Sequence, residues 1–274
     1  MRAQALHPDV LLVTSAVLAL NCVVVRAELG EPAGESEGFL IDSPVLPEEL
    51  DSLPGLLGQA GFPEPDGLLA THGDWDHLLG RLAFPELALG CAESTIERLD
   101  ASPGEAQREL RAFDEELYIE RPGPLALGSL QALPVPGRLD IGDREIELHP
   151  TGGHTVDGMA LLVGWAGVLA VGDYLSPIEI PTISPGGNVE AYLQTLGRLR
   201  GLLERVEHVI PGHGPRMDAE RARSVLDEDV AYLEQLSVRG EAAALPAGRR
   251  GAEQRRLHAR NVASVHAADA QSSG

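Results

Sequence analysis

The sequence predicts a mixed α/β fold, because strand patterns and helix patterns follow each other twice along the chain. Short apolar runs rich in Val and Leu, such as residues 10–14 and 18–26, are typical of strands. The segment 190–206 instead places leucines at the spacing of one helix face. At 274 residues and 29.0 kDa, the chain is long enough to bury the core of one layered α/β domain.

The first half of the chain predicts a strand meander followed by helices. A loop rich in Gly, Pro and Glu at residues 28–37 separates the second strand from the third, and Ser102-Pro103 separates two helical patterns. Four prolines make residues 121–137 loop-like. The expected elements are strands at 10–14, 18–26, 38–42 and 67–70, and helices at 47–58, 93–99 and 104–117.

The second half repeats this order of strands and helices. The expected elements are strands at 144–149, 159–163, 168–171 and 208–210, and helices at 190–206, 218–236 and 253–266. Gly240 and residues 245–248 break the last helical pattern, and residues 270–274 are expected to be disordered. We therefore predict one domain over residues 1–237, followed over residues 238–274 by a linker, a C-terminal helix and a disordered tail.

The charge of the chain excludes several classes of function. The formal net charge is −21 and the isoelectric point is about 4.7, so a polyanionic partner such as nucleic acid is repelled. Every basic residue is arginine, and no lysine is present to form a Schiff base or to bind phosphate in a P-loop. The expected partner is a small-molecule substrate, and the oligomeric state stays open.

Two cysteines and one apolar run indicate the cellular compartment of the protein. Cys22 and Cys91 are far apart and in no metal-binding spacing, which favours a reducing compartment. The apolar run at residues 10–25 is interrupted by polar side chains and lacks the flanks of a signal peptide, so we expect two strands there and no membrane partner. A cytoplasmic location is the expectation.

The segment Thr71–His77 concentrates four potential metal ligands directly after the apolar stretch Gly67–Ala70. The four are His72, Asp74, Asp76 and His77. Carboxylates and imidazoles crowded this closely are costly to bury unless a cation neutralises them. The pattern therefore predicts a metal site at a strand end, and its two sides can serve two ions.

This segment resembles the H-x-H-x-D-H signature of the metallo-β-lactamase fold hydrolases, with Asp74 where that family usually has its second histidine. Three later segments resemble the remaining motifs in the same order. Residues 150–155 resemble the family's G-H-T loop, residues 171–173 its bridging aspartate, and residues 210–214 its last histidine loop.

The resemblance implies an αββα sandwich with a helical C-terminal segment and a dinuclear metal site. It assigns His72, Asp74 and His154 to one metal ion, Asp76, His77 and His213 to the other, and Asp173 to a bridge between them. Zinc is the usual metal by family. A water shared by the two cations is the implied nucleophile. Asp76 and Asp173 would orient or deprotonate that water.

Other residues have roles that the resemblance leaves less defined. Asp42 is expected to orient a ligand histidine, and Tyr174 is a candidate catalytic donor to the pocket. Trp75 is interpreted as a pocket wall or a core residue. His258 and Asn261 could reach over the pocket, but a solvated basic helix face is the preferred interpretation.

Asp74 is the one departure from the usual motif. It either ligates a metal directly, which is the preferred interpretation, or acts through water or by holding another ligand. Its extra negative charge should make the site less cationic by one unit and lower its Lewis acidity, and its oxygen should favour manganese or iron over zinc. The flavodiiron proteins of this fold carry a glutamate at this position.

Three functions remain open. The favoured one is a metal-dependent hydrolase of a small ester, thioester or lactone, resembling the glyoxalase II and lactonase branches. The second is a di-iron, oxygen-reducing redox protein, suggested by Asp74. The third is a metal-binding module without catalytic activity.

Overall fold

The computed structural model describes residues 1–30 and 35–272. Within them, seven strands form one sheet in the order β1-β2-β3-β4-β5-β6-β7. These strands are β1 (Arg2–His7), β2 (Val10–Thr14), β3 (Asn21–Glu28), β4 (Ser36–Ile41), β5 (Gly67–Leu69), β6 (Leu89–Ala92) and β7 (Leu130–Leu133). The first four pair antiparallel, and three of them, β2 to β4, form the predicted meander, while β4 to β7 are parallel.

A second sheet comes from the other half of the chain, and its order in the described residues is β12-β11-β10-β9-β8. Its strands are β8 (Gly137–Ile141), β9 (Arg144–Pro150), β10 (Met159–Val163), β11 (Val168–Ala170) and β12 (His208–Ile210). β11 and β12 are parallel, and the remaining pairs are antiparallel.

The two sheets pack face to face, and this explains why several strands are apolar on both sides. In β3, Val23 and Val25 point into the layer between the sheets, while Val24 points toward the outer helices. In β10, Leu161 faces the other sheet and Leu162 faces outward. Because successive side chains of a strand point to opposite faces, such continuous apolar runs indicate strands buried on both faces.

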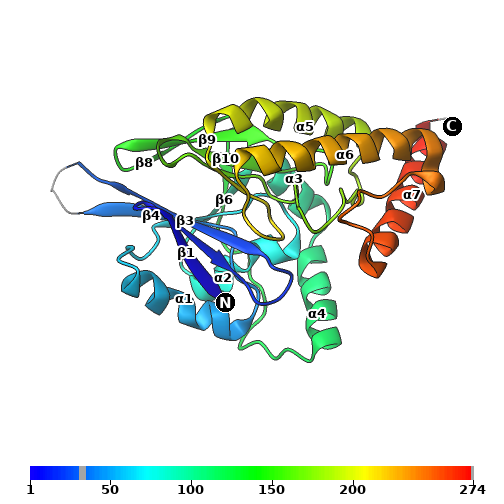
Figure 1. Ribbon diagram of the computed structural model, residues 1–274. Helices are drawn as coiled ribbons and strands as arrows, with labels where there is room; N and C mark the ends of the chain where they lie inside the picture. Colours follow the sequence, from blue (N-terminus) through cyan, green and yellow to red (C-terminus); the bar gives the residue numbers. More distant parts are fainter. Residues whose placement is uncertain (31–34, 273–274) are drawn as a thin grey trace.

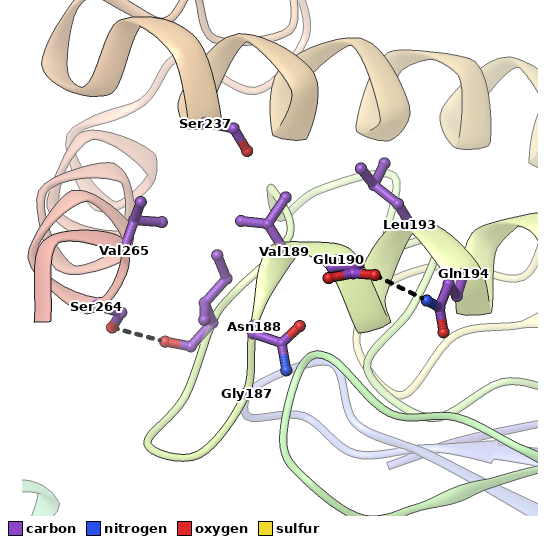
Figure 2. Close-up of a pocket in the computed structure, with 10 residues that line it drawn as sticks. Gly187, Asn188, Val189, Glu190, Leu193, Gln194, Ser237, Ser264 and Val265 are labelled. Atoms are coloured by element: carbon purple, nitrogen blue, oxygen red, sulfur yellow. Dashed lines mark hydrogen bonds between the residues drawn. The ribbon is translucent and has the colours of Figure 1, made fainter. Parts of the chain in front are cut away.

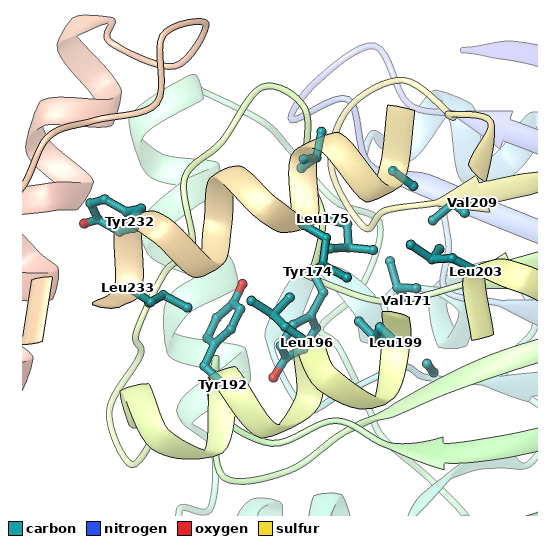
Figure 3. Packing of buried hydrophobic residues seen from close by; sticks show 14 of the residues in the cluster. Val171, Tyr174, Leu175, Tyr192, Leu196, Leu199, Leu203, Val209, Tyr232 and Leu233 are labelled. Carbon is teal, nitrogen blue, oxygen red and sulfur yellow. The ribbon is translucent and has the colours of Figure 1, made fainter. Parts of the chain in front are cut away.

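Helices cover both outer faces of the sandwich (Figure 1). On the first sheet lie α1 (Pro47–Gln59), α2 (Gly80–Ala83), α3 (Glu93–Ala101) and α4 (Glu105–Leu117). On the second sheet lie α5 (Val189–Leu202) and α6 (Ala219–Arg239). Figure 3 shows how Leu196 and Leu199 of α5 pack with Leu233 of α6 over Val171 and Tyr174. The layers are those of the expected αββα sandwich.

The C-terminal part of the chain is a helix packed at one end of the sandwich. α7 (Ala252–Ser272) follows α6 after a short turn, Gly240–Ala242, and an irregular segment. It extends beyond the expected helix at 253–266 and includes residues 270–272, which were expected to be disordered; residues 273 and 274 lie outside the described residues. Among those residues, no helix combines the length and the apolar character that crossing a membrane requires.

The largest error of the sequence prediction concerns residues 121–137, which were expected to be a loop. Residues 130–133 form β7 at the edge of the first sheet, and β8 begins at Gly137. The prolines that suggested a loop flank these strands instead of interrupting them. The strands β1 and β6 were also not expected. The loop expected at residues 28–37 is described only at its ends, because residues 31–34 lie outside the described residues.

Candidate metal centre

All four predicted ligand segments follow the carboxyl ends of strands, which brings them to one edge of the sandwich. Residues 71–77 follow β5, and His154 lies in the loop between β9 and β10. Asp173 follows β11, and His213 follows the neighbouring parallel strand β12. The seven predicted ligands, separated by up to 141 positions in the sequence, therefore meet in space.

The first group of ligand atoms combines His72, Asp74 and His154. Asp74 Oδ2 lies 3.5 Å from His72 Nε2 and 3.3 Å from His154 Nε2. The backbone of Asp74 is extended, because the short helix Trp75–Leu78 begins directly after it. This conformation separates Asp74 from Asp76 and directs the two carboxylates to different groups of ligands.

The second group combines Asp76, His77 and His213. His213 Nε2 lies 3.3 Å from Asp76 Oδ2, and His77 Nε2 lies 3.9 Å from Asp76 Oδ1. Both groups thus contain two imidazole nitrogens and one carboxylate. The set matches the ligands that divalent transition metals bind in proteins.

Asp173 lies between the two groups and presents one oxygen to each. Its Oδ2 is 3.9 Å from His72 Nε2 and 3.5 Å from His154 Nε2. Its Oδ1 is 3.2 Å from His77 Nε2 and 3.4 Å from His213 Nε2. This is the arrangement expected of a carboxylate that bridges two metal ions.

Three atoms of this cluster are buried without a hydrogen bond, namely His72 Nε2, His77 Nε2 and Asp173 Oδ1. Buried polar atoms without a partner are costly, and each of these points toward the other ligands. Gly212 keeps the space open, since a Cβ there would lie 2.1 Å from Asp173 Oδ1. The residues therefore fit a pair of divalent cations.

The outer nitrogens of the histidines are held in the orientation that ligation requires. His154 Nδ1 donates to the carbonyl of Thr182 at 2.8 Å, and His213 Nδ1 donates to the carbonyl of Leu18 at 3.0 Å. A carbonyl oxygen can only accept, so both rings carry their proton on Nδ1 and leave Nε2 free for a metal.

Asp42 supports His77, as expected from its position in the sequence. Its Oδ2 lies 3.0 Å from His77 Nδ1, while Thr71 donates its backbone N–H and its hydroxyl to the same carboxylate. Asp42 has a φ of +56°, a conformation that aspartate tolerates better than most residues. The carboxylate makes His77 a stronger donor to a metal.

Arg98 on α3 binds the outer oxygen of Asp74, and no sequence pattern had indicated this contact. Its guanidinium donates to Asp74 Oδ1 at 2.6 Å and to Asp157 Oδ1 at 3.0 Å. Asp157 also accepts the backbone N–H of Gly73 at 2.9 Å, which fixes the ligand segment. The negative charge that Asp74 brings to the first group is therefore partly offset by a half-buried arginine that lies directly against it.

The pKa values show the mutual attraction of the two kinds of ligand. Burial alone would raise the pKa of Asp74, but His72 and His154 hold it well below its usual value. Burial alone would lower the pKa of His154, but Asp74 and Asp173 raise it to about 9. Protons and metal ions therefore compete for the same imidazole nitrogens.

A cavity of about 170 Å³ adjoins the first ligand group. Its lining combines one ligand, one arginine, two glutamates and small side chains: Asp74, Arg98, Ser102, Glu105, Glu109, Val156, Ser184 and Pro185. None of the second group's ligands lines it. The first group thus borders the larger of two spaces beside the ligands, since the one next to Asp173 and His213 holds only about 10 Å³.

Of the two aromatic residues considered for the pocket, Tyr174 had been interpreted as a donor and Trp75 as either a wall or a core residue; both lie elsewhere. Tyr174 is buried in the core beside Tyr192, and its hydroxyl accepts the backbone N–H of His154 at 3.0 Å. It is absent from the cavity lining, which corrects its interpretation as a pocket donor. Trp75 packs against Phe113 of α4, with ring centroids 4.7 Å apart, and is a core residue.

Asn261 is not on a solvated helix face, as had been expected, but fully buried against the loop after Asp173. Its neighbour His258 contacts Tyr232 and Glu241 instead of the cavity. Asn21 is a further residue that the sequence did not reveal. Its side-chain amide donates to the carbonyls of Pro211 and Gly214, and it thereby holds the segment that carries His213.

Residues 18–213 match the family described as the metallo-beta-lactamase superfamily. This range contains all seven candidate ligands and most of both sheets. Comparison of the sequence with curated proteins gave no significant match.

Several solved structures have the same fold at low sequence identity. The sec-alkylsulfatase Pisa1 from Pseudomonas sp. has a TM-score of 0.70 at 15% identity; the match covers 96% of this chain and 49% of that one, so the chain spans about half of its length. A metallo-beta-lactamase family protein from Thermus thermophilus, TTHA1429, has a TM-score of 0.68 at 19% identity. The match covers 98% of this chain and 95% of that one.

A third structure, that of TTHA1623 in a di-iron-bound form, has a TM-score of 0.57 at 22% identity and covers 78% of this chain and 97% of that one. At such identities these likenesses show the fold alone. Since the family match extends over most of the chain, the chain belongs to the metallo-beta-lactamase superfamily.

Proposed function

We propose that the protein is a metal-dependent hydrolase that acts on a small ester, thioester or lactone. The observation that carries this proposal is the position of Asp173, whose two oxygens face two separate groups of ligands. One group is sufficient for a structural metal ion. A shared carboxylate between two groups is instead typical of sites that activate water.

Two divalent ions held here would supply Lewis acidity, which makes water nucleophilic near neutral pH and polarises the oxygen of the bond under attack. The chain's own residues then have distinct tasks. His72, Asp74 and His154 would hold one ion, and Asp76, His77 and His213 the other. Asp76 and Asp173 are the proposed acceptors of the proton that the attacking water loses. Tyr174 and Thr182 keep His154 in place.

The surroundings support a small substrate and argue against covalent catalysis by a thiol. Cys22 and Cys91 are both fully buried in the core. The cavity beside Asp74 is small, and Glu105 and Glu109 on its rim would repel a polyanion. The acidic net charge acts in the same direction. The expected cytoplasmic location and the absence of nucleic-acid and membrane partners remain predictions.

The proposal is tested by a hydrolysis screen on protein of known metal content. The screen compares thioesters, lactones, aryl esters and phosphodiesters, with zinc, manganese or iron added to metal-free protein. We expect metal-dependent turnover of at least one ester, thioester or lactone. If protein loaded with two metal ions hydrolyses none of these substrates, the result would favour a metal-binding module without catalytic activity.

A di-iron redox protein is the second candidate, and Asp74 favours it. Its oxygen, directed toward two histidines, gives the first group a harder donor than a third imidazole would. The structure of TTHA1623 in a di-iron-bound form shows that this fold accommodates two irons. Visible absorption of protein purified without added metal separates the candidates, because zinc gives no visible band. Iron bound at two per chain, with oxygen consumption in the presence of a reductant, would replace the hydrolase proposal.

A further inference from the structure

The segment Ser176–Ser184, here called the clamped loop, connects the candidate metal centre to α7. Its beginning contacts the second ligand group, since the hydroxyl of Ser176 donates to the carbonyl of His213 at 2.9 Å. Its end contacts the first group twice. The carbonyl of Thr182 accepts from His154 Nδ1 at 2.8 Å, and the N–H of Ser184 donates to the carbonyl of His154 at 2.8 Å.

The backbone of the clamped loop is bound by side chains from the C-terminal part of the chain, beyond the family match. Arg249 donates to the carbonyls of Ser176 at 3.1 Å and Glu179 at 2.7 Å. The N–H of Ile180 donates to Gln254 at 2.8 Å. Arg249 and Gln254 are buried, so these bonds form out of contact with water, where an unpaired backbone group is costly.

Asn261 binds the clamped loop on both sides of Thr182, the residue that accepts from His154. Its Oδ1 accepts the N–H of Ile183 at 2.9 Å, and its Nδ2 donates to the carbonyl of Pro181 at 2.6 Å. The N–H of Ile183 and the carbonyl of Thr182 belong to one planar peptide group. Asn261 therefore binds the outer edge of the same peptide whose inner edge binds His154.

The clamped loop lies between two cavities, which makes these hydrogen bonds important for its position. The cavity beside Asp74 borders Ser184 and Pro185 on one side. On the other side, a cavity of about 960 Å³ between α5 and α7 borders Ile183 and Gly187 (Figure 2). Figure 2 also shows the hydrogen bond by which Ser264 of α7 reaches the loop, at the carbonyl of Ile183.

We propose that Asn261 is a positioning residue for His154, which it orients through the Thr182–Ile183 peptide. The hydrogen bond to Oδ1 fixes the tilt of the peptide plane, and the carbonyl on the opposite edge then fixes the ring of His154 with Nε2 toward the ligands. The two bonds lie in one chain and strengthen each other. α7 thereby becomes part of the metal centre although it contributes no ligand.

The inference rests on the proposed assignment of His154 as a ligand, and its test uses cobalt binding rather than hydrolysis. Metal-free protein is titrated with Co²⁺ alone, and its visible absorption reports the occupancy and geometry of each site. Asn261→Leu keeps the size of the side chain and removes both hydrogen bonds to the clamped loop, together with one to the hydroxyl of Tyr232. We expect the cobalt affinity of one of the two sites, the one that contains His154, to fall by about 10- to 100-fold. This is the usual effect of losing a partner that supports a ligand.

Ser264→Ala is the matched control, because it removes a hydrogen bond between α7 and the same loop residue without touching the Thr182–Ile183 peptide. It should leave both cobalt affinities unchanged. Asn261→Asp keeps the oxygen that accepts the N–H of Ile183. This variant is used if the leucine variant does not fold. Its cobalt affinity at the affected site should fall between those of wild type and the leucine variant.

A double-mutant cycle separates positioning from general loss of structure. In a His154→Ala background, Asn261→Leu should cause no further loss of cobalt affinity, whereas in a His213→Ala background it should still weaken the remaining site. Equal losses in both backgrounds, or unchanged cobalt spectra and affinities, would overturn the inference while the proposed function stands. If the wild-type protein binds no cobalt, both the proposed function and this inference fail.

Discussion

The two candidate half-sites contain the same kinds of donor but differ in their surroundings. Each has two histidines and one carboxylate, with Asp173 between them. In the first, Asp74 is bound from behind by Arg98 and its side chain is 21% exposed beside a cavity. In the second, Asp76 is 10% exposed, and none of its described contacts is an arginine. The first half-site is therefore more open and carries a nearby positive charge.

The groups that bind the outer nitrogens of the histidines also differ between the two half-sites. His77 in the second half-site has the carboxylate of Asp42 behind it, whereas His154 in the first has only the neutral carbonyl of Thr182. A carboxylate makes an imidazole a stronger ligand than a carbonyl does. We infer that the second half-site binds metal more tightly, while the first exchanges its metal more readily and contacts the substrate.

The largest expected effect comes from removing the residue that the half-sites share. Asp173→Ala should lower the metal content from two ions per chain to one and reduce hydrolysis by more than about 100-fold, because losing a mere supporting partner already costs 10- to 100-fold. Elemental analysis and steady-state kinetics on an activated thioester or lactone measure both. Cys22→Ala and Cys91→Ala are the controls and should keep full activity. A saturated stoichiometry of one that Asp173→Ala leaves unchanged would disprove the bridge.

The comparison itself is tested by removing one carboxylate from each half-site. Asp76→Ala should weaken cobalt binding at the tighter of the two sites, and Asp74→Ala at the weaker one, by at least about tenfold in each case. Thermal unfolding of the metal-free variants should show that both proteins remain folded. If Asp74→Ala keeps wild-type metal content and rates, Asp74 is not a ligand and the case for a harder metal is lost.

Much of the site could be predicted because its ligands lie in short segments after apolar strands. His72, Asp76 and His77 stand within six residues, and a carboxylate cluster of that density needs a cation. Arg98 had no such signal: it is one of many arginines, and only the packing of α3 beside the ligand segment brings it to Asp74. Asp157 had a weak signal, since it stands three residues after His154.

Asn261 shows a second limit of the sequence. Its helix has arginines on several sides, so the pattern suggested a solvated face, yet the clamped loop buries Asn261 completely. The fold had a similar limit at β7, where the four residues before Pro134 become a strand only because β6 offers an unpaired edge. In both cases the partner is distant in sequence, and local propensity cannot reveal it.

A further effect is expected from pH, because protons compete with the metal. Burial lowers the pKa of His154, but Asp74 and Asp173 raise it to about 9, and the pKa of His213 is also raised above the usual value by Asp173 and Asp76. Below about pH 9, binding must displace a proton from His154. Cobalt affinity at the first half-site should therefore rise with pH by roughly tenfold per unit for the proton that His154 releases, and this contribution should level off near pH 9. An affinity that is constant between pH 6.5 and 8.5 would contradict these protonation states.

The smallest and most specific effect concerns the charge pair that distinguishes the first half-site. Asp74→His removes a negative charge and leaves Arg98 paired with Asp157 alone among its described carboxylate partners, so water at the metals should ionise more readily and the acidic limb of the pH–rate profile should move to lower pH by about one unit. Arg98→Met removes the positive charge instead and should move that limb to higher pH. The double variant Asp74→His/Arg98→Met restores the original charge and should return the limb to its wild-type position. If both single variants shift the limb in the same direction, Arg98 does not act on the metal centre through its charge, and its role is limited to holding Asp74 and Asp157 in place.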